Sequence, residues 1–434
     1  MATENTEDFD IHDPAFAADP YPTYERLRRE CPVVHGEKHG GYWLLTRYED
    51  VRQATRDWKT FTSGVPGVTS IPVATRRTEP QLPLELDPPL HSRYRALVNP
   101  VFSPARIEAL RPRVEAIASQ LVDAILDRSP LGSAGSSDCT GLADLVRDYC
   151  VPLSVETLAE FTGLPRDDAP KWVDWATRLF DVNNREDGVR ATHELNTYID
   201  GLIAVRRRMP RPDLVGILLE SEVDGHHLTD QEIRAFCQLQ FLAGFETTWD
   251  AMSVTLLYLL GDPDGPEIRR RLAADPTLIP AAVEEFLRYV TPIQIFGRNA
   301  THDLALHGHA IPKGDVVAVS FASANHDPSV FPDPERCLLD RFQSRRSNAS
   351  IPGSAGSPSG VAGSGGQDAA PGRHFTFGAG VHLCLGAPVA RLELAITLRE
   401  FTTRAAHLRL DTQYPPLWKT RGDRRGLSSL PVLV

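Results

Sequence analysis

The 434-residue sequence is poor in cysteine, has no excess of basic residues and contains no apolar run long enough to span a bilayer. Its six cysteines are scattered along the chain, and no two of them form a Cys-x-x-Cys pair. This spacing excludes a disulfide scaffold and an iron–sulfur cluster. Five of the cysteines are interpreted as small apolar core residues: Cys31, Cys139, Cys150, Cys237 and Cys337.

The charge balance limits the classes of partner. Lys and Arg number 46 against 57 Asp and Glu, for a formal net charge of -11. A nucleic-acid partner needs a basic surface that neutralises phosphates, so this balance argues against nucleic-acid binding. It leaves room for a local basic patch that docks an acidic protein. Because composition shows no break along the chain, we expect a single domain, residues 1–434, with a sizeable core.

The N-terminal segment, residues 1–13, is acidic and polar. It has neither the basic start nor the apolar stretch of a signal peptide. With no apolar run of membrane-spanning length elsewhere, we expect a soluble, cytoplasmic protein with no membrane partner.

One glycine-rich segment, residues 377–386, places Cys384 just before an apolar helical run, Ala387 to Phe401. The free amides of a helix start and the close backbone approach allowed by glycine favour a thiolate with a depressed pKa. No second cysteine or tetrahedral ligand set lies nearby, so the segment predicts one sulfur facing one flat cofactor, a haem-thiolate site. The sequence lacks Cys-x-x-Cys-His, which indicates a haem held without covalent attachment.

Two basic residues, His91 and Arg95, lie four apart after the segment Asp87-Pro88-Pro89. Asp87 is predicted to cap the helix, and the prolines suit its first turn. His91 and Arg95 then share one helical face, which suits an anionic ligand such as a carboxylate pair. From this stretch alone, an ordinary solvated helix face is the favoured interpretation.

A helix of unusual length is predicted from Thr229 to about Leu260, starting with the capping box Thr229 to Glu232. In its middle, the segment 243–248 combines a glycine, an acid and two hydroxyl groups. Glycine costs about 1 kcal/mol relative to alanine there, and such local misfit is typical of functional sites. The alternative is a tolerated kink with Glu246 facing solvent.

The remaining pattern is mainly helical, with a smaller β portion. Helices are predicted at 23–29, 49–58, 104–127, 144–164, 168–209 and 280–290, and strands at 42–46, 293–298, 304–307, 316–320, 408–410 and 430–434. Residues 61–86 form a long loop of the kind that binds ligands. Residues 343–372 are rich in Gly, Ser, Ala and Pro, and they are interpreted as a flexible insertion within the domain.

These motifs, in this order, resemble those of the cytochrome P-450 superfamily, most closely its soluble bacterial members. Residues 377–386 match F-G-x-G-x-H-x-C-x-G, residues 243–248 match A-G-x-[DE]-T-T, and residues 87–95 match D-P-P-x-H-x-x-x-R. The resemblance implies the cytochrome P-450 fold, mainly α with a smaller β portion, in which a long central helix lies over a haem. The insertion at 343–372 departs from the family, which usually closes this connection in a few residues.

The resemblance assigns roles to individual residues. It implies haem b with Cys384 as the axial iron ligand, Phe377 shielding the sulfur, and Glu246 and Thr247 delivering protons to bound oxygen. The positions that match haem-propionate ligands are His91, Arg95, Arg298 and His382. Further positions expected against the haem are Ala243, Gly244, Gly378 and Gly386. The pair Glu285 and Arg288 matches the family pattern E-x-x-R, and Arg341 is its expected third member.

The implied function is a monooxygenase that inserts one atom of O₂ into a small hydrophobic substrate, by hydroxylation or epoxidation. Electrons would come from an external ferredoxin and ferredoxin reductase, docked on a basic patch that includes Arg93, Arg391 and Arg399. Two alternatives are an enzyme that couples or rearranges its substrate without oxygen insertion, and a catalytically silent haem-binding recruitment protein. The expected pocket lining is 61–86, 172–198, 239–247 and 293–296, with Gln240 and Gln294 as polar anchors.

Overall fold

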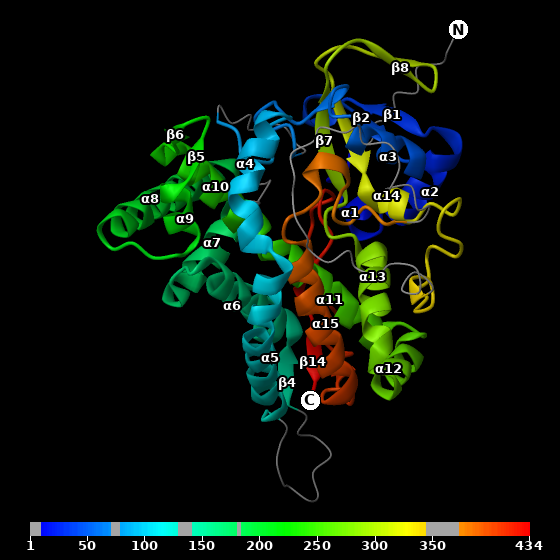
Figure 1. Cartoon of the computed structure of the whole chain (residues 1–434). Coiled ribbons are helices and arrows are strands. Elements are labelled where there is room, and N and C mark those ends of the chain that lie inside the picture. The colour runs from blue at the N-terminus through cyan, green and yellow to red at the C-terminus, as the bar shows by residue number, and fades with distance from the viewer. Residues whose placement is uncertain (1–9, 71–78, 129–140, 180–183, 344–372) are drawn as a thin grey trace, which may run out of the picture.

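The structure, a computed structural model, describes residues 10–70, 79–128, 141–179, 184–343 and 373–434 (Figure 1). The insertion predicted at 343–372 lies outside the described residues except for Gln343. Four of the five cysteines expected in the core are buried, and Cys139 lies outside the described residues. Among the described residues, no helix combines the length and apolar character that crossing a membrane requires.

Helices make up most of the described chain, as predicted. Their bounds are α1 Pro14–Ala18, α2 Tyr21–Glu30, α3 Tyr48–Arg56, α4 Leu90–Val98, α5 Pro104–Leu126, α6 Val151–Thr162, α7 Ala169–Leu179, α8 Arg185–Arg208, α9 Leu214–Glu220, α10 Asp230–Ala243, α11 Glu246–Gly261, α12 Gly265–Ala274, α13 Ile279–Val290, α14 Phe321–Asn325 and α15 Ala387–Thr403. In Figure 1, α11 and α15 occupy the centre of the molecule, and the two helices pack on each other. Helix α11 is buried on nearly every side, as expected for a helix that crosses the core.

The strands form one five-stranded sheet and several short ladders. Their bounds are β1 Val33–Gly36, β2 Tyr42–Leu45, β3 Phe61–Thr62, β4 Leu142–Asp144, β5 Glu222–Val223, β6 His226–His227, β7 Ile295–Ala300, β8 Leu304–Leu306, β9 His309–Ile311, β10 Val316–Ser320, β11 Arg409–Leu410, β12 Leu417–Trp418, β13 Leu427–Ser429 and β14 Pro431–Leu433. The main sheet has the order β1-β2-β10-β7-β3, and its central strand β10 is buried throughout. It lies at the upper right of Figure 1, with most helices below it and to its left.

The prediction of one continuous helix from Thr229 to Leu260 is wrong. The capping box at Thr229 is present, but α10 ends at Ala243 and α11 begins at Glu246. A Cβ added at Gly244 would lie 2.4 Å from the Gln240 carbonyl oxygen and 2.9 Å from a side-chain carbon of Leu158. Only glycine fits this close packing, and the chain breaks there rather than bending gradually.

The predicted Asp87 cap is also wrong. The residue that precedes α4 is Pro89, and no side chain caps that helix. The Asp87 carboxylate instead accepts hydrogen bonds from the Thr62 hydroxyl and, at 3.2 Å, from the Ser63 amide. Two prolines separate Asp87 from the first helical residue, so its side chain ties the start of the 61–86 loop to α4.

The predicted brace of Glu285, Arg288 and Arg341 is present behind the cysteine segment. Glu285 and Arg288 are fully buried, and the guanidinium donates to both carboxylate oxygens at 2.9 Å. Arg341 Nε donates to the same carboxylate at 3.0 Å. The brace joins α13 to the irregular segment 326–342, which is how it fixes the region beneath Cys384.

Candidate functional site

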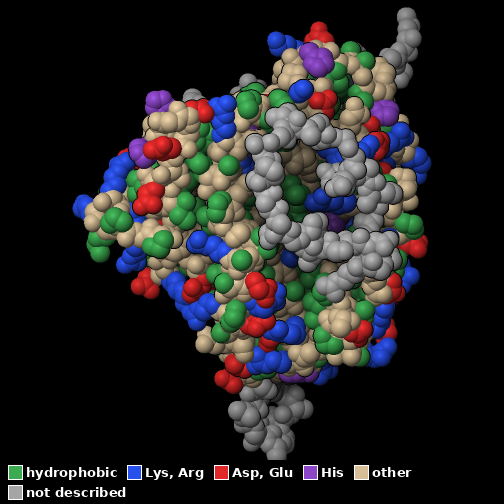
Figure 2. All heavy atoms as spheres, in the orientation of Figure 1, with side chains coloured by type: hydrophobic (Ala, Val, Ile, Leu, Met, Phe, Trp, Pro, Cys, Tyr) green, Lys and Arg blue, Asp and Glu red, His purple; other side chains and the backbone are tan. Residues whose placement is uncertain are grey.

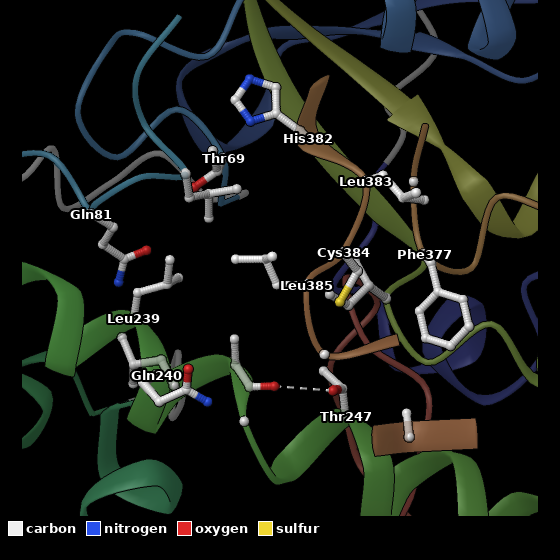
Figure 3. A pocket seen from close by; sticks show the side chains of 18 of the residues that line it. Thr69, Gln81, Leu239, Gln240, Thr247, Phe377, His382, Leu383, Cys384 and Leu385 are labelled. Carbon is white, nitrogen blue, oxygen red and sulfur yellow. Dashed lines mark hydrogen bonds between the residues drawn. The ribbon is translucent and has the colours of Figure 1, made fainter. Parts of the chain in front are cut away.

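A largely apolar cavity of about 320 Å³ lies between the α10–α11 break, α4, β7 and the cysteine segment. Figure 3 shows Thr247 on one wall, Cys384 on another, and Gln81 and Gln240 farther along the space. Figure 2 shows a hollow in one face of the molecule, between α4 and the strands around β7, with basic and histidine side chains inside it. The sequence motifs, far apart along the chain, therefore meet around one space.

Cys384 lies between the 3₁₀ turn Gly380–His382 and the start of α15, and its sulfur faces the cavity. Its amide donates to the Phe377 carbonyl at 2.9 Å, which closes the loop. The predicted depressed pKa is wrong for the protein alone: burial raises the pKa of Cys384, against the lowering effect of the Gly386 amide and Arg95. The Cys384 side chain is exposed to the cavity, so a metal cation in that space could reach the sulfur and would stabilise its thiolate form.

Two glycines set the path of the cysteine loop. Gly378 and Gly380 have φ of 66° and 67°, in the left-handed region that side chains rarely adopt. A Cβ at Gly380 would also lie 2.8 Å from the Thr55 carbonyl oxygen of α3. These constraints explain the glycine pattern of the loop and fix where the Cys384 sulfur points.

Four basic side chains from three elements gather along one side of the cavity: His91 and Arg95 of α4, Arg298 of β7, and His382. The ring centroids of His91 and His382 are 4.4 Å apart. His91 is only 2% exposed, so the favoured interpretation of a solvated helix face is wrong, and the anion-binding interpretation fits. Burial lowers the pKa of His91 to about 4 and the pKa of Arg298 to about 10.

These basic groups have spare hydrogen-bonding capacity. Among the described residues, Nδ1 of His91 and both ring nitrogens of His382 have no hydrogen-bond partner. Arg95 donates to the main-chain carbonyls of Val381, at 3.0 Å, and Leu383, which orients it along the cysteine loop. Buried cations and unpartnered nitrogens are costly unless an anion binds them. The group therefore fits the two carboxylates of a haem placed over the Cys384 sulfur.

Across the cavity from Cys384, the break between α10 and α11 exposes Ala243, Gly244 and Thr247 to the space. The Thr247 hydroxyl donates to the Ala243 carbonyl at 3.3 Å, a long bond drawn dashed in Figure 3. This weak bond leaves the hydroxyl able to turn toward a ligand in the cavity.

Glu246 is held outside the cavity lining. Its carboxylate accepts hydrogen bonds at 2.8 Å from both Lys419 and Arg424, so the alternative of a solvent-facing Glu246 is wrong. Burial acts to raise its pKa, but Arg424 and Lys419 hold that pKa below its ordinary value. Lys419 also pairs with the fully buried Asp250 at 2.7 Å. Sequence reasoning missed this network, although its signal was the charged run 419–425 between two short strands.

The substrate side of the cavity matches the expected lining in part. Thr69, Gln81 and Gln240 line it, as do residues of 293–296, but the predicted segment 172–198 does not. Helices α7 and α8 lie one layer behind α10, where Trp172 packs on Phe241 at 5.5 Å between ring centroids. The prediction of Gln294 as a polar anchor is also wrong. Its amide points away from the cavity and donates to the Thr291 carbonyl at 2.5 Å.

The three arginines predicted as a basic patch are each paired with a carboxylate. The nitrogen–oxygen distances are 2.5 Å for Arg93 with Asp224, 2.6 Å for Arg391 with Glu284 and 2.9 Å for Arg399 with Glu115. Their positive charge is therefore balanced locally.

Comparisons with known proteins agree with the geometry. The family model described as Cytochrome P-450 matches residues 166–404. The cytochrome P-450 monooxygenase PikC of Streptomyces venezuelae is 34% identical, with 96% of this chain and 91% of that protein covered. The vitamin D(3) 25-hydroxylase of Pseudonocardia autotrophica is 32% identical, with 100% and 98% covered.

Solved structures show the same similarity. The polyketide synthase cytochrome P-450 PksS of Bacillus subtilis 168 has a TM-score of 0.79 at 31% identity, covering 98% of this chain and 99% of that one. A Bacillus megaterium structure in complex with testosterone has a TM-score of 0.79 at 27% identity, covering 97% and 99%.

Proposed function

The chain belongs to the cytochrome P-450 family of haem-thiolate monooxygenases, and on that premise we propose that it oxidises a small, mainly hydrophobic molecule in this cavity. In the proposed reaction, one atom of O₂ enters a C–H or C=C bond of the substrate. The other atom leaves as water, with two electrons and two protons consumed. The observation that carries the proposal is the Cys384 sulfur facing a largely apolar cavity, with Thr247 on the opposite wall.

We propose haem b as the cofactor and Cys384 as its axial ligand. When bound, the haem supplies the activation of dioxygen, and a thiolate ligand favours cleavage of the O–O bond. His91, Arg95, Arg298 and His382 would hold the propionates. The burial of His91 and Arg298 and the unpartnered ring nitrogens of His91 and His382 support this assignment.

Proton delivery is proposed to pass through Thr247, whose side chain lines the cavity beside the α10–α11 break. Its hydroxyl can give up the 3.3 Å bond to Ala243 and donate into the cavity. Glu246 is ionised in its ion pairs, so it would first have to leave Lys419 or Arg424 and take up a proton from solvent before it could pass that proton to Thr247. Arg424 lines the cavity although Glu246 does not, so a molecule in the cavity can contact one member of this ion pair.

The substrate is proposed to be a mainly apolar molecule anchored by one or two hydrogen bonds. The polar groups available away from Cys384 include Gln81, Gln240 and Thr69. One relative is named a vitamin D(3) 25-hydroxylase and another is bound to testosterone, and apolar molecules of that size are the first compounds to test.

Electrons are proposed to come from an external ferredoxin and its reductase. The scattered cysteines support this, since the sequence holds no cluster ligands of its own. Arg93, Arg391 and Arg399 are each paired with a carboxylate of this chain. A docked ferredoxin could use these charges only if the ion pairs open. In that case, reversing the charge of Arg93 or Arg399 should slow reduction by ferredoxin.

The proposed function is tested by turnover under isotopically labelled dioxygen. Compounds that displace water from the site are first found by the spin-state change of the haem spectrum. The product of such a compound should carry one labelled oxygen atom, with one further labelled atom in water. A product without the label would contradict the proposal and favour coupling or rearrangement without oxygen insertion.

A further inference from the structure

A half-buried cluster of ionisable side chains lies beside the cysteine segment, outside the lining of the cavity. It comprises Glu284 of α13, His374 and Arg391 of α15, here called the proximal cluster. We infer that Glu284 is a positioning residue that holds Arg391 over Phe377 and balances its charge beside Cys384, and so sets the reduction potential of the bound haem. This inference depends on the proposed function, because it requires Cys384 to be the iron ligand.

The geometry of the proximal cluster is closely constrained. Arg391 donates Nε to one Glu284 oxygen at 2.6 Å and Nη2 to the other at 3.0 Å, a bidentate pair. His374, which is 4% exposed, contacts the second oxygen through Nε2 at 3.1 Å. Both oxygens of Glu284 are therefore occupied, and the guanidinium has one orientation.

The cluster carries one negative and one positive charge. Burial acts to raise the pKa of Glu284, but hydrogen bonds from His374 and Arg391 hold that pKa well below its usual range, so it is ionised. Burial lowers the pKa of His374, so at neutral pH the ring is neutral and donates its Nε2 hydrogen to Glu284. Removing either Glu284 or Arg391 alone would leave a single net charge close to the sulfur.

Two interactions couple Arg391 to Cys384. Its guanidinium carbon lies 4.5 Å from the centroid of the Phe377 ring, within the range of a cation–π contact. Phe377 in turn accepts the Cys384 amide hydrogen at 2.9 Å through its main-chain oxygen, and the two side chains lie near each other in Figure 3. Arg391 also acts through space, because its positive charge interacts directly with the charge on the Cys384 sulfur.

The signs of the effects follow from this arrangement. A positive charge beside the iron ligand favours the ferrous form, which carries one positive charge less than the ferric form. Neutralising Glu284 leaves Arg391 unbalanced and should raise the reduction potential. Neutralising Arg391 leaves Glu284 unbalanced and should lower it. A purely structural contact would not produce opposite shifts from the two members of one pair.

The experiment is a spectroscopic redox titration of the substrate-free, haem-loaded full chain and its variants. Glu284→Gln should shift the ferric–ferrous equilibrium toward the ferrous form by about threefold to tenfold, where tenfold is 59 mV for one electron. Arg391→Gln should shift it the other way by a similar factor, and the double variant should lie between them. Arg391→Lys keeps the charge and should stay nearer the parent protein than Arg391→Gln does.

The matched control is Glu267 with Arg270 on α12, an exposed pair with the same bidentate geometry at 2.8 and 2.7 Å. Glu267→Gln and Arg270→Gln should change the equilibrium less than twofold. Shifts of the same sign in Glu284→Gln and Arg391→Gln, or shifts no larger than in the controls, would overturn the inference. If Glu284→Gln does not hold haem, the comparison of Arg391→Gln with Arg391→Lys decides it.

The carbon monoxide spectrum of the parent protein distinguishes a failure of the Glu284 inference from a failure of the proposed function. A long-wavelength Soret band with unshifted potentials in the variants would leave the proposed function standing and overturn this inference alone. Absence of that band in the parent protein would overturn both.

Discussion

Replacing Arg288 by methionine tests how strongly the buried brace stabilises the fold. Arg288 is fully buried and donates to both Glu285 oxygens and to the carbonyls of Asn325, Pro334 and Arg336, at 2.8–3.0 Å. Breaking one side of a buried ion pair costs about 3–5 kcal/mol, because the partner charge is left unbalanced. Since a typical domain has about 5–15 kcal/mol of stability, Arg288→Met should lose a large part of it.

The assay is urea unfolding of the haem-loaded protein, followed by helical signal and haem absorbance together. Arg270→Met, which removes the exposed α12 partner of Glu267, is the control and should unfold at nearly the same urea concentration as the parent protein. Exchanging both Glu285 and Arg288 for apolar residues should recover part of the loss. The reasoning is refuted if Arg288→Met and Arg270→Met unfold at the same urea concentration.

Three further predictions follow from the site. Thr247→Ala should consume reductant with little product, measured as product formed per reductant oxidised; a normal ratio would contradict its role in proton delivery. Gly380→Ala should lower the temperature of haem release, whereas Gly308→Ala, where φ is 85° but a Cβ meets open space, should lower it less. Burial raises the pKa of Asp250 from 3.8 to about 6, so the folded protein keeps a proton that the unfolded chain loses. Stability should therefore fall as the pH rises between these values, and Asp250→Asn should lack that slope in urea titrations.

Local sequence signals predicted the parts of the structure that depend on near neighbours. The capping box at Thr229, the buried strand Val316–Ser320 and the helix after Cys384 all depend on residues within a few positions of each other. The motif at 377–386 also predicted a loop whose glycines are required by positive φ and close packing. Such features can be read from the chain because their cause is local.

The errors have long-range causes. Glu246 is held by Lys419 and Arg424, which lie 173 and 178 residues further along the chain, and no local pattern pairs them. The break at Gly244 packs against Leu158 of α6, a neighbour that no local pattern identifies. His91 looks like a surface residue in its own helix, and only the approach of the His382 loop buries it.

The central claim is that Cys384 is the axial ligand of a haem in this cavity. The most direct test is the absorbance of the reduced protein under carbon monoxide, compared between the parent chain and Cys384→Ser. We predict the long-wavelength Soret band of thiolate ligation in the parent and its loss in Cys384→Ser, with the helical signal unchanged. A parent protein without that band, or a variant that keeps it, would contradict the account.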